Sequence, residues 1–321
     1  MDTRNRNKTL LLAGVTALLL LAYSSSVSSA IVTSSYLYNL SNFTGTVRFS
    51  WVRSFIDPKS GEIYVTEGNT VRVFNQTGME IFSFGDEVDL GVIYDIALDP
   101  EGRVLTLSYQ GTDFFIVQCD FRGESIGKIR IANLPTDYSD FHPNRMICRE
   151  GSIFLVDMSR MRVAVVDGNG IFQKGYDLVA LMDISEKDRQ DVNIMGLSIM
   201  GFSMDGEGNM LFTVPVLYRA YKVTPEGKVS SFGKRGSAPG RFGVVAGIAA
   251  DGKGNYLVAD TLRSVVMIFD KNFQFQGEFG YRGFKPGNLI GPREVTVDTN
   301  NRVYVTQLRG RGISVYSLLG N

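Results

Sequence analysis

The chain has 321 residues, a formal net charge of zero, 44% hydrophobic residues and 21% charged residues. This length can bury the core of one large domain or of two ordinary ones, and the composition is that of a folded globular protein. The balanced charge supplies no overall basic field, so the composition gives no support to a nucleic-acid partner, and we predict none.

The N-terminus has the three-part pattern of a secretory signal peptide. Basic residues in the stretch Arg4–Lys8 precede an apolar run, Leu10–Ala22, and a stretch of small residues ends at Ala30. We therefore predict that residues 1–30 are a signal peptide and that the protein is periplasmic or extracellular. The alternative is an uncleaved N-terminal membrane anchor, although the apolar run of about 13 residues is shorter than the ~20 that a spanning helix needs.

Six copies of one short pattern follow along the chain. Each copy has a turn ending in glycine or asparagine, a strand rich in β-branched and aromatic residues, a polar loop and a second such strand. The copies begin at Asp57, Asp99, Arg149, Asp205, Asp251 and Asp298. A strand before the turn and another late in the unit bring the count to about four strands per ~45 residues. We therefore predict an all-β fold, a six-bladed β-propeller of four-stranded antiparallel blades, over residues 31–321.

The two ends of the repeat array predict how the ring closes. The sixth copy stops after its third strand, at Tyr316 and Ser317, while the segment Ser35–Leu40 has the pattern of a strand with no blade of its own. We expect this N-terminal strand to supply the outer strand of the last blade, because that arrangement removes an open sheet edge.

The fifth and sixth copies share a longer motif. "FGKRGSAPGRFG" begins at Phe232 and "FGYRGFKPGNLIG" at Phe279, with a period of about 47 residues. The glycines do not form a P-loop, because no G-K-[ST] ending and no helix follow them. Together with the hairpins that follow, these stretches resemble the NHL repeat, and the resemblance covers about Trp51–Gly320. It implies a six-bladed propeller of the exported bacterial type, and a protein-binding role, because NHL-type propellers generally serve as interaction platforms.

Arginine is prominent in the loops that a propeller presents on one face, which are the linkers between blades and the loops between second and third strands. The predicted binding face consists of Arg72, Arg160, Arg162, Tyr218, Arg219, Arg235, Arg241, Asp260, Arg263, Arg309 and Arg311. One hypothesis is a cationic surface for an acidic protein partner in the cell envelope or outside the cell. The other is local pairing of each arginine with a carboxylate such as Asp157 or Asp260.

The residues that open the innermost strands are expected to line the mouth of the central channel. They include Asp95, Asn144, Arg145, Gly247 and Glu294. Asp95 and Glu294 are carboxylates that could ligate a hard cation such as Ca²⁺, which takes several oxygen ligands. Two carboxylates are few for such a site, and solvated charges at the end of a channel are the alternative interpretation.

Catalytic motifs are scarce in this sequence. His142 is the only histidine, which excludes zinc sites built on two or three histidines, and no G-x-S-x-G occurs. We therefore predict no catalytic residues, no enzymatic activity and no cofactor beyond a Ca²⁺ ion; the predicted function is an exported protein-binding or assembly scaffold. The alternative is a metal-dependent hydrolase or lactonase that is similar to the gluconolactonase-like propellers and depends on Asp95 and Glu294.

The chain has two cysteines, Cys119 and Cys148. Export makes a disulfide between them chemically permissible. Two buried thiols in strands are the other interpretation, and a chain of this length does not depend on a single disulfide for its core.

Overall fold

The computed structural model describes residues 33–49, 52–85, 90–182, 184 and 196–319. These residues belong to one compact unit, Val32–Gly320. The predicted signal peptide, residues 1–30, lies outside the described residues, so export stays a prediction. Within the described ranges, no helix is both long and apolar enough to cross a membrane.

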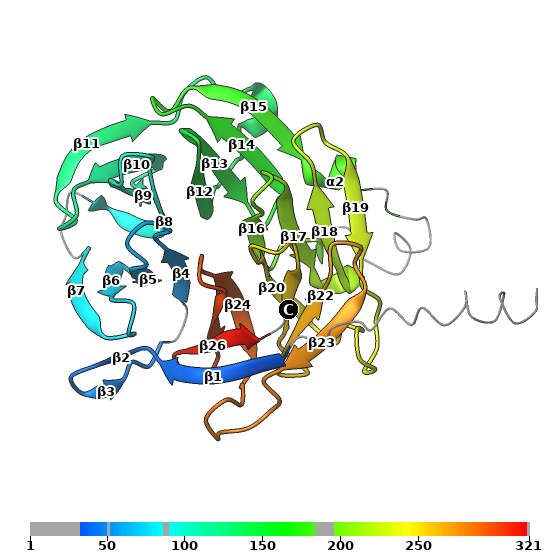
Figure 1. Cartoon of the computed structure of the whole chain (residues 1–321). Coiled ribbons are helices and arrows are strands. Elements are labelled where there is room, and N and C mark those ends of the chain that lie inside the picture. The colour runs from blue at the N-terminus through cyan, green and yellow to red at the C-terminus, as the bar shows by residue number, and fades with distance from the viewer. Residues whose placement is uncertain (1–32, 50–51, 86–89, 183, 185–195, 320–321) are drawn as a thin grey trace, which may run out of the picture. The chain divides into compact units, whose positions relative to one another are not determined.

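Six four-stranded antiparallel sheets form the body of this unit, arranged as blades around a central axis (Figure 1). The strands nearest the axis are β4 (Val52–Ile56), β8 (Val92–Leu98), β12 (Arg145–Arg149), β16 (Phe202–Met204), β20 (Val245–Ala250) and β24 (Pro292–Val297). The second strands are β5 (Ile63–Glu67), β9 (Val104–Gln110), β13 (Ser152–Asp157), β17 (Met210–Val214), β21 (Tyr256–Asp260) and β25 (Arg302–Gln307). The third strands are β6 (Thr70–Phe74), β10 (Asp113–Cys119), β14 (Arg162–Val166), β18 (Arg219–Val223), β22 (Val265–Phe269) and β26 (Ile313–Leu319). The outer strands are β7 (Glu80–Phe84), β11 (Ser125–Arg130), β15 (Phe172–Asp177), β19 (Val229–Phe232), β23 (Phe275–Phe279) and β1 (Thr33–Asn39).

This architecture confirms the predicted six-bladed β-propeller. We number the blades 1 to 6 in chain order, starting from the sheet that begins with β4 and ending with the sheet that contains β24. Each blade runs from the axis outward, so the strands of one repeat copy are spread across the full radius of the ring (Figure 1).

The N-terminal strand β1 closes the ring. It pairs antiparallel with β26, beginning with Thr33 opposite Leu319, and is the outer strand of blade 6. The prediction for Ser35–Leu40 is therefore confirmed. A small hairpin, β2 (Ser41–Asn42) and β3 (Gly45–Thr46), lies between β1 and blade 1 in the chain.

The aspartate that opens most copies of the repeat explains the tight turn between the first and second strands. In blade 5, Asp251 Oδ1 accepts hydrogen bonds from the backbone N–H groups of Lys253 (2.9 Å) and Asn255 (2.8 Å). Gly254 has a φ of 85°, a left-handed conformation that glycine adopts without steric cost. Asp205 holds the corresponding turn of blade 4 in the same way. The repeated D-x-x-G pattern is thus explained by local turn chemistry.

The hydrophobic core is divided into six clusters, each between two neighbouring blades. The repeated linkers contribute to it directly, because Phe242 packs between blades 4 and 5, Leu289 packs between blades 5 and 6, and both are fully buried. Each linker folds back on itself, with Phe242 N–H donating to Lys234 O and Leu289 N–H to Tyr281 O, both at 2.9 Å. The glycine-rich linker motif is therefore a packing element.

The described residues also include three short helical turns. The turns are the 3₁₀ helices η2 (Thr136–Tyr138) and η4 (Pro215–Leu217) and the α-helix α2 (Leu178–Leu181).

The two cysteines are free thiols. Cys119 ends β10 and Cys148 lies in β12 of the next blade, and no disulfide joins them. Cys119 is fully buried, and burial raises the pKa of the Cys148 thiol to about 11. The structure therefore has two thiols in strands.

Candidate ligand-binding site

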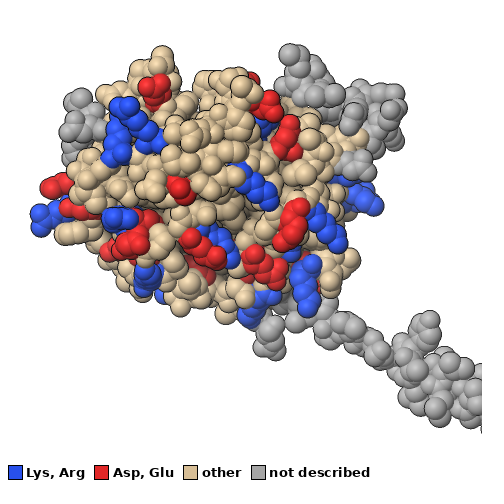
Figure 2. Space-filling model, turned by 90° about the horizontal axis from the view of Figure 1, so that it is seen from above, with Lys and Arg blue, Asp and Glu red and all other residues tan. Residues whose placement is uncertain are grey.

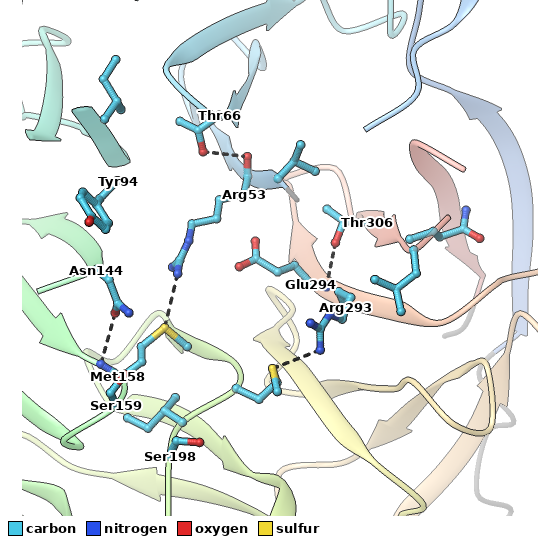
Figure 3. A pocket seen from close by; sticks show the side chains of 17 residues that line it. Arg53, Thr66, Tyr94, Asn144, Met158, Ser159, Ser198, Arg293, Glu294 and Thr306 are labelled. Carbon is cyan, nitrogen blue, oxygen red and sulfur yellow. Dashed lines mark hydrogen bonds between the residues drawn. The ribbon is translucent and has the colours of Figure 1, made fainter. Parts of the chain in front are cut away.

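A cavity of about 580 Å³ lies at the axis of the ring (Figure 3). It opens on the face formed by the blade linkers and by the loops between second and third strands, which we call the loop face. Its walls come from blades 1, 2, 3, 4 and 6. A cavity of this volume is within the range of small-molecule sites, and we call it the axial pocket.

Both apolar and polar side chains line the axial pocket. The apolar ones include Ile93, Met158, Ile199, Met200 and Leu308. The polar ones include Arg53, Tyr94, Asn144, Arg293 and Glu294. An apolar wall with a few placed charges is the usual composition of a site for a small organic molecule.

Of the described residues, none from blade 5 lines the pocket; near the axis the blade 5 backbone at Gly247 lies close to the backbones of blades 4 and 6. A Cβ atom built on Gly247 would lie 2.6 Å from Glu294 Cα, and one built on Gly201 would lie 2.6 Å from Gly247 Cα. Any side chain at these two positions would therefore push neighbouring strands apart. The two glycines allow blades 4, 5 and 6 to meet near the axis, and this approach places Glu294 in the pocket.

Four charged side chains from blades 1, 2, 3 and 6 form a line of alternating sign across the axis, which we call the axial charge chain. Arg53 Nη1 lies 4.0 Å from Asp95 Oδ2, and this oxygen lies 3.5 Å from Arg145 Nη1. Arg145 Nη1 lies in turn 3.7 Å from Glu294 Oε1. These distances exceed those of good hydrogen bonds, so Coulomb attraction is the main force within the chain.

Asp95 and Arg145 are the two middle members of the axial charge chain. The Asp95 side chain is 3% exposed, and its Oδ2 accepts a hydrogen bond from Met146 N–H at 2.8 Å. Desolvation disfavours the charged form of Arg145, but attraction to Asp95 and then Glu294 outweighs it and raises the pKa of the guanidinium. The structure thus brings together at the axis the residues that the sequence placed there, namely Asp95, Asn144, Arg145, Gly247 and Glu294.

The two carboxylates do not fit the Ca²⁺ site that the sequence suggested. Arg145 Nη1 already lies between them, 3.5 Å from Asp95 Oδ2 and 3.7 Å from Glu294 Oε1. A guanidinium therefore balances their charge, whereas Ca²⁺ takes about six to eight oxygen ligands. In the part of the chain that the structure describes, no group of three or more His, Cys, Asp or Glu side chains could hold a metal ion.

Arg53 and Arg293 are pocket residues that the sequence analysis missed. Each has a guanidinium nitrogen near the sulfur of a methionine two blades away in the ring, and Figure 3 shows the contact from Arg53 to Met158. Arg53 Nη2 lies 3.6 Å from Met158 Sδ, and Arg293 Nη1 lies 3.4 Å from Met200 Sδ. A thioether sulfur is only a weak acceptor, so the Met158 sulfur does not balance the guanidinium charge of Arg53. Burial lowers the pKa of Arg293 below its ordinary value, and attraction to Glu294 acts against this effect.

A positional signal for one of these arginines is present in the sequence. Arg53 stands four residues before Asp57, the position that Asp95, Gly247 and Glu294 occupy before the turn aspartates of their own copies. Comparing this position across the copies would have identified Arg53 as a channel residue, whereas Arg293 lies one residue earlier in its copy and has no such signal.

The arrangement can bind an anion and can move a proton. Three arginines, Arg53, Arg145 and Arg293, face two carboxylates, Asp95 and Glu294, so the pocket carries an excess of positive charge. Arginines at this depth stabilise negative charge that develops on a bound molecule. Among the described residues that line the pocket, Glu294 is the carboxylate, and a carboxylate can accept a proton from a bound molecule.

Several arginines of the loop face have carboxylate partners nearby. Arg160 and Arg162 both donate to Asp140, at 2.8 Å each, and the hydrogen bond from Arg160 holds the pKa of Asp140 below its ordinary value. The same kind of pair joins Arg72 to Glu80 at 3.1 Å and Arg263 to Glu278 at 2.8 Å. Figure 2 shows basic and acidic side chains interspersed on the face in view.

Other predicted face residues contact their own loops. Asp260 is fully buried, and its carboxylate accepts hydrogen bonds from the backbone N–H groups of Gly243, Val244 and Arg263. It therefore shapes the loop between β21 and β22. Arg219 begins β18 and is half-buried.

The remaining predicted residues lie toward blades 4, 5 and 6. Arg235 and Arg241 are exposed in the linker, and the Arg235 guanidinium lies 5.1 Å from the centre of the Tyr218 ring. In blade 6, Arg309 is exposed in the loop between β25 and β26. Arg311, in the same loop, lies over the ring of Phe284 in the neighbouring linker, 5.6 Å from its centre.

Comparison with known proteins shows the fold. No protein-family model matches the chain. Protein brain tumor of Drosophila melanogaster is 31% identical over 91 residues, which are 28% of this chain and 9% of that protein. Virginiamycin B lyase from Staphylococcus aureus is similar in structure, with a TM-score of 0.58, 12% identity and coverage of 90% of this chain and 100% of that chain. A calcium-binding protein, regucalcin, from Agrobacterium tumefaciens has a TM-score of 0.57, 14% identity and coverage of 88% and 96%.

The similarity to virginiamycin B lyase corrects one prediction. The scarcity of catalytic motifs led us to predict that this chain is not an enzyme, and that prediction is overturned because an enzyme has the same fold over 90% of this chain. The physical reason is that a propeller enzyme assembles its site from single residues of several blades, so no contiguous motif is needed. At 12% identity the similarity shows the fold alone, and the reaction of that lyase is not transferred.

Proposed function

We propose that the axial pocket binds a small organic anion, which is the ligand or substrate of this propeller. The observation that carries the proposal is that two arginines, Arg53 and Arg293, line a cavity of about 580 Å³ in which the Arg53 guanidinium faces the sulfur of Met158. A carboxylate or phosphate oxygen is a much stronger acceptor than a thioether, so an anion that enters gains charge-assisted hydrogen bonds. The apolar wall, which includes Met158 and Met200, receives the rest of the molecule.

The fold shared with a lyase supports a pocket that also acts on its ligand. In that case Glu294 is the group that moves a proton, because its carboxylate lines the pocket beside the arginines. The arginines would stabilise the anion that proton removal leaves.

The proposal is tested by calorimetric titration of the full chain with a panel of carboxylates and phosphate monoesters. Arg53→Met and Arg293→Met should each weaken binding at least about tenfold, because each removes a charge-assisted hydrogen bond. Arg122→Met is the control, since Arg122 is an exposed cation in the turn between β10 and β11, away from the loop face. The proposal fails if no anion of the panel binds at millimolar concentration, or if both pocket variants bind as the wild type does.

A second candidate function, a protein-binding platform, is favoured by exposed apolar side chains on the loop face. Leu262, Tyr281 and Phe284 are 63%, 61% and 72% exposed, and they lie in the loops of blades 5 and 6, which also carry Arg235 and Arg241. The resemblance to NHL-type propellers supports a protein partner for this surface, and the exposed cations Arg235 and Arg241 favour an acidic one. We place this partner in the cell envelope or outside the cell.

A photo-crosslinking residue at position 284 tests the platform function, with the same residue at position 121 as the control. Phe121 is 74% exposed, in the turn between β10 and β11 away from the loop face. Crosslinks to one acidic protein from position 284 alone, lost on Arg235→Glu, are expected. Equal crosslinking from both positions contradicts the function.

Export of the chain is supported by the pattern of residues 1–30, which lie outside the described residues. We propose that cleavage follows Ala30 and that residues 31–321 form the mature propeller. The intact mass of the protein recovered from the exported fraction measures this. A mass that includes the leader, on a membrane-bound protein, supports the uncleaved anchor instead.

A further inference from the structure

Of the described residues that line the axial pocket, Tyr94 is the one aromatic residue (Figure 3). Tyr94 is 39% exposed, whereas its neighbours in the chain, Ile93 and Asp95, are buried. Aromatic side chains usually bury most of their surface, because they carry a large apolar area. Tyr94 thus combines a place on the pocket wall with a ring surface that a bound molecule can cover.

A β-bulge places Tyr94 at this wall. The pairing of β8 with β9 shifts its register between Ile93 and Asp95, so Tyr94 is the extra residue. A bulge leaves its extra residue out of the ladder and re-aims the side chain, and bulges are over-represented beside active sites. The innermost strand of blade 6 has a similar register shift over the stretch that contains Arg293 and Glu294. The bulge therefore sets the direction of Tyr94 independently of the regular alternation of the strand.

Two further rings hold the Tyr94 ring in place. Its centre lies 5.7 Å from that of Phe114 and 6.3 Å from that of Tyr109, with interplanar angles of 60° and 86°. Tilted and edge-to-face pairs at these distances are favourable. The centres of the Tyr109 and Phe114 rings are themselves 4.8 Å apart, so the three rings form one cluster. A ring that is already fixed loses little freedom when a ligand covers it, which lowers the entropic cost of binding.

Other side chains of the pocket also favour an aromatic molecule. Met158 and Met200 supply thioether sulfurs to the lining, and sulfur makes favourable contacts with the edges of aromatic rings. The Arg53 side chain is 24% exposed, and a guanidinium is attracted to the face of a ring. A saturated ring of the same size fills the same volume but gains none of these contacts. The lining therefore distinguishes a π system from an aliphatic group.

Tyr94 lies beside the residues that attract the anion. Arg53 Nη1 is 4.0 Å from the carboxylate of Asp95, the residue that follows Tyr94 in the chain. Arg53 and Tyr94 also line the same cavity of about 580 Å³, a volume in the range of small-molecule sites. One bound molecule can therefore contact the pocket arginines and the Tyr94 ring.

We propose that the ligand of the axial pocket is an aromatic anion, whose ring packs against Tyr94 while the pocket arginines bind its anionic group. This inference rests on the proposed anion-binding function and names the chemical class of the anion. Tyr94 is the residue that determines specificity for the ring.

Calorimetric titration of the full chain with matched pairs of anions tests this inference. The pairs are phenylacetate and cyclohexylacetate, 3-phenylpropionate and 3-cyclohexylpropionate, and phenyl phosphate and cyclohexyl phosphate. The members of a pair share their anionic group and ring size and differ in the π system. In at least one pair the aromatic member should bind about three- to tenfold more tightly, the gain expected from an aromatic contact. Burial of apolar surface alone predicts no preference or the opposite one, because the saturated ring is the more apolar.

Side-chain variants assign the preference to the Tyr94 ring. Tyr94→Leu should lower the ratio of affinities within a pair toward one, and Tyr94→Phe should keep the ratio because it keeps the ring. Phe121→Leu is the control, since Phe121 is an aromatic residue that is 74% exposed outside the pocket. Circular dichroism and the melting temperature check that each variant folds. If Tyr94→Leu does not fold, Tyr94→Gln, whose polar side chain suits an exposed position, replaces it.

The outcomes distinguish this inference from the function on which it rests. If no aromatic member binds more tightly than its saturated partner, or if another carboxylate or phosphate binds and none of the six probes does, the aromatic class is overturned while anion binding stands. If the preference persists in a folded Tyr94→Leu or Tyr94→Gln variant, or is lost in Tyr94→Phe, the assignment to the Tyr94 ring is overturned. If no anion binds at millimolar concentration, the anion-binding function fails and this inference fails with it.

Discussion

Replacing Arg145 by methionine should destabilise the propeller strongly. The Arg145 side chain is 14% exposed and lies within ion-pair distance of both Asp95 and Glu294. Methionine is apolar and of similar length, so the substitution mainly removes the charge. It leaves the two carboxylates near the axis with Arg53 as the remaining cation of the axial charge chain.

The distances set the magnitude of this effect. At 3.5 and 3.7 Å, each contact of Arg145 has a Coulomb energy of about 4–5 kcal/mol at an effective dielectric constant of ~20. Desolvation of the charged groups offsets most of this energy in the wild type, but removing one partner of a buried pair costs about 3–5 kcal/mol. At about 2 °C per kcal/mol for a domain of this size, the melting temperature should fall by roughly 6–10 °C.

Urea unfolding of the wild type and the variant measures the free-energy difference at pH 7. The triple variant Arg145→Met, Asp95→Asn, Glu294→Gln should recover most of the loss, because it removes the charges that the single variant leaves without a partner. A loss below about 1 kcal/mol, or a triple variant no more stable than the single variant, would refute this account of the axial charge chain.

Three further changes test the glycine contact, one loop-face pair and one thiol. Gly247→Ala should lower the free energy of unfolding by about 1–3 kcal/mol, because the new Cβ would lie 2.6 Å from the blade 6 backbone; Gly252→Ala, with no atom nearer than 3.8 Å, is the control in the same urea titration. The hydrogen bond from Arg160 holds the pKa of Asp140 low, so the ionised Asp140 contributes stability at neutral pH, and this stability is lost as the pH falls through the lowered pKa. The difference in melting temperature between the wild type and Asp140→Asn should therefore close below about pH 4. A difference that stays constant with pH contradicts the pairing. Burial raises the pKa of the Cys148 thiol to about 11, so it should react slowly with a disulfide reagent at pH 8 in the native protein and rapidly in urea, whereas rapid native reaction would show an accessible thiolate.

The fold could be predicted because its signals are local and repeated. Most of the turns are held by an aspartate such as Asp251 that accepts hydrogen bonds from backbone N–H groups within four residues, and the linkers carry residues such as Phe242 that pack between blades. These interactions act over a few residues, so they leave a periodic trace in the sequence. Closure by the N-terminal strand could also be inferred, because an incomplete last copy and a strand without a blade require each other.

The site could be predicted only in part. The position of Asp95, Arg145 and Glu294 near the axis followed from the repeat, but their pairing did not, and the proposed Ca²⁺ ligands lie on either side of a guanidinium. Arg53 and Arg293 lie in innermost strands, whereas the arginines predicted from the sequence lie mostly in loops, where several have carboxylate partners nearby. The prediction that the chain is not an enzyme failed for a related reason: it rested on the scarcity of contiguous motifs, but residues of separate blades meet in the axial pocket of this fold.

The sequence by itself determined the number of blades, the strands of each blade, the closure of the ring and several of the residues that lie near its axis. The reason is that turn chemistry, strand alternation and linker packing are short-range and recur with the repeat. Only the tertiary structure decided which charges at the axis meet, because Arg53, Asp95, Arg145 and Glu294 come from four blades separated by most of the chain. Their distances depend on how closely neighbouring blades pack, as at Gly247, and no local pattern records that distance.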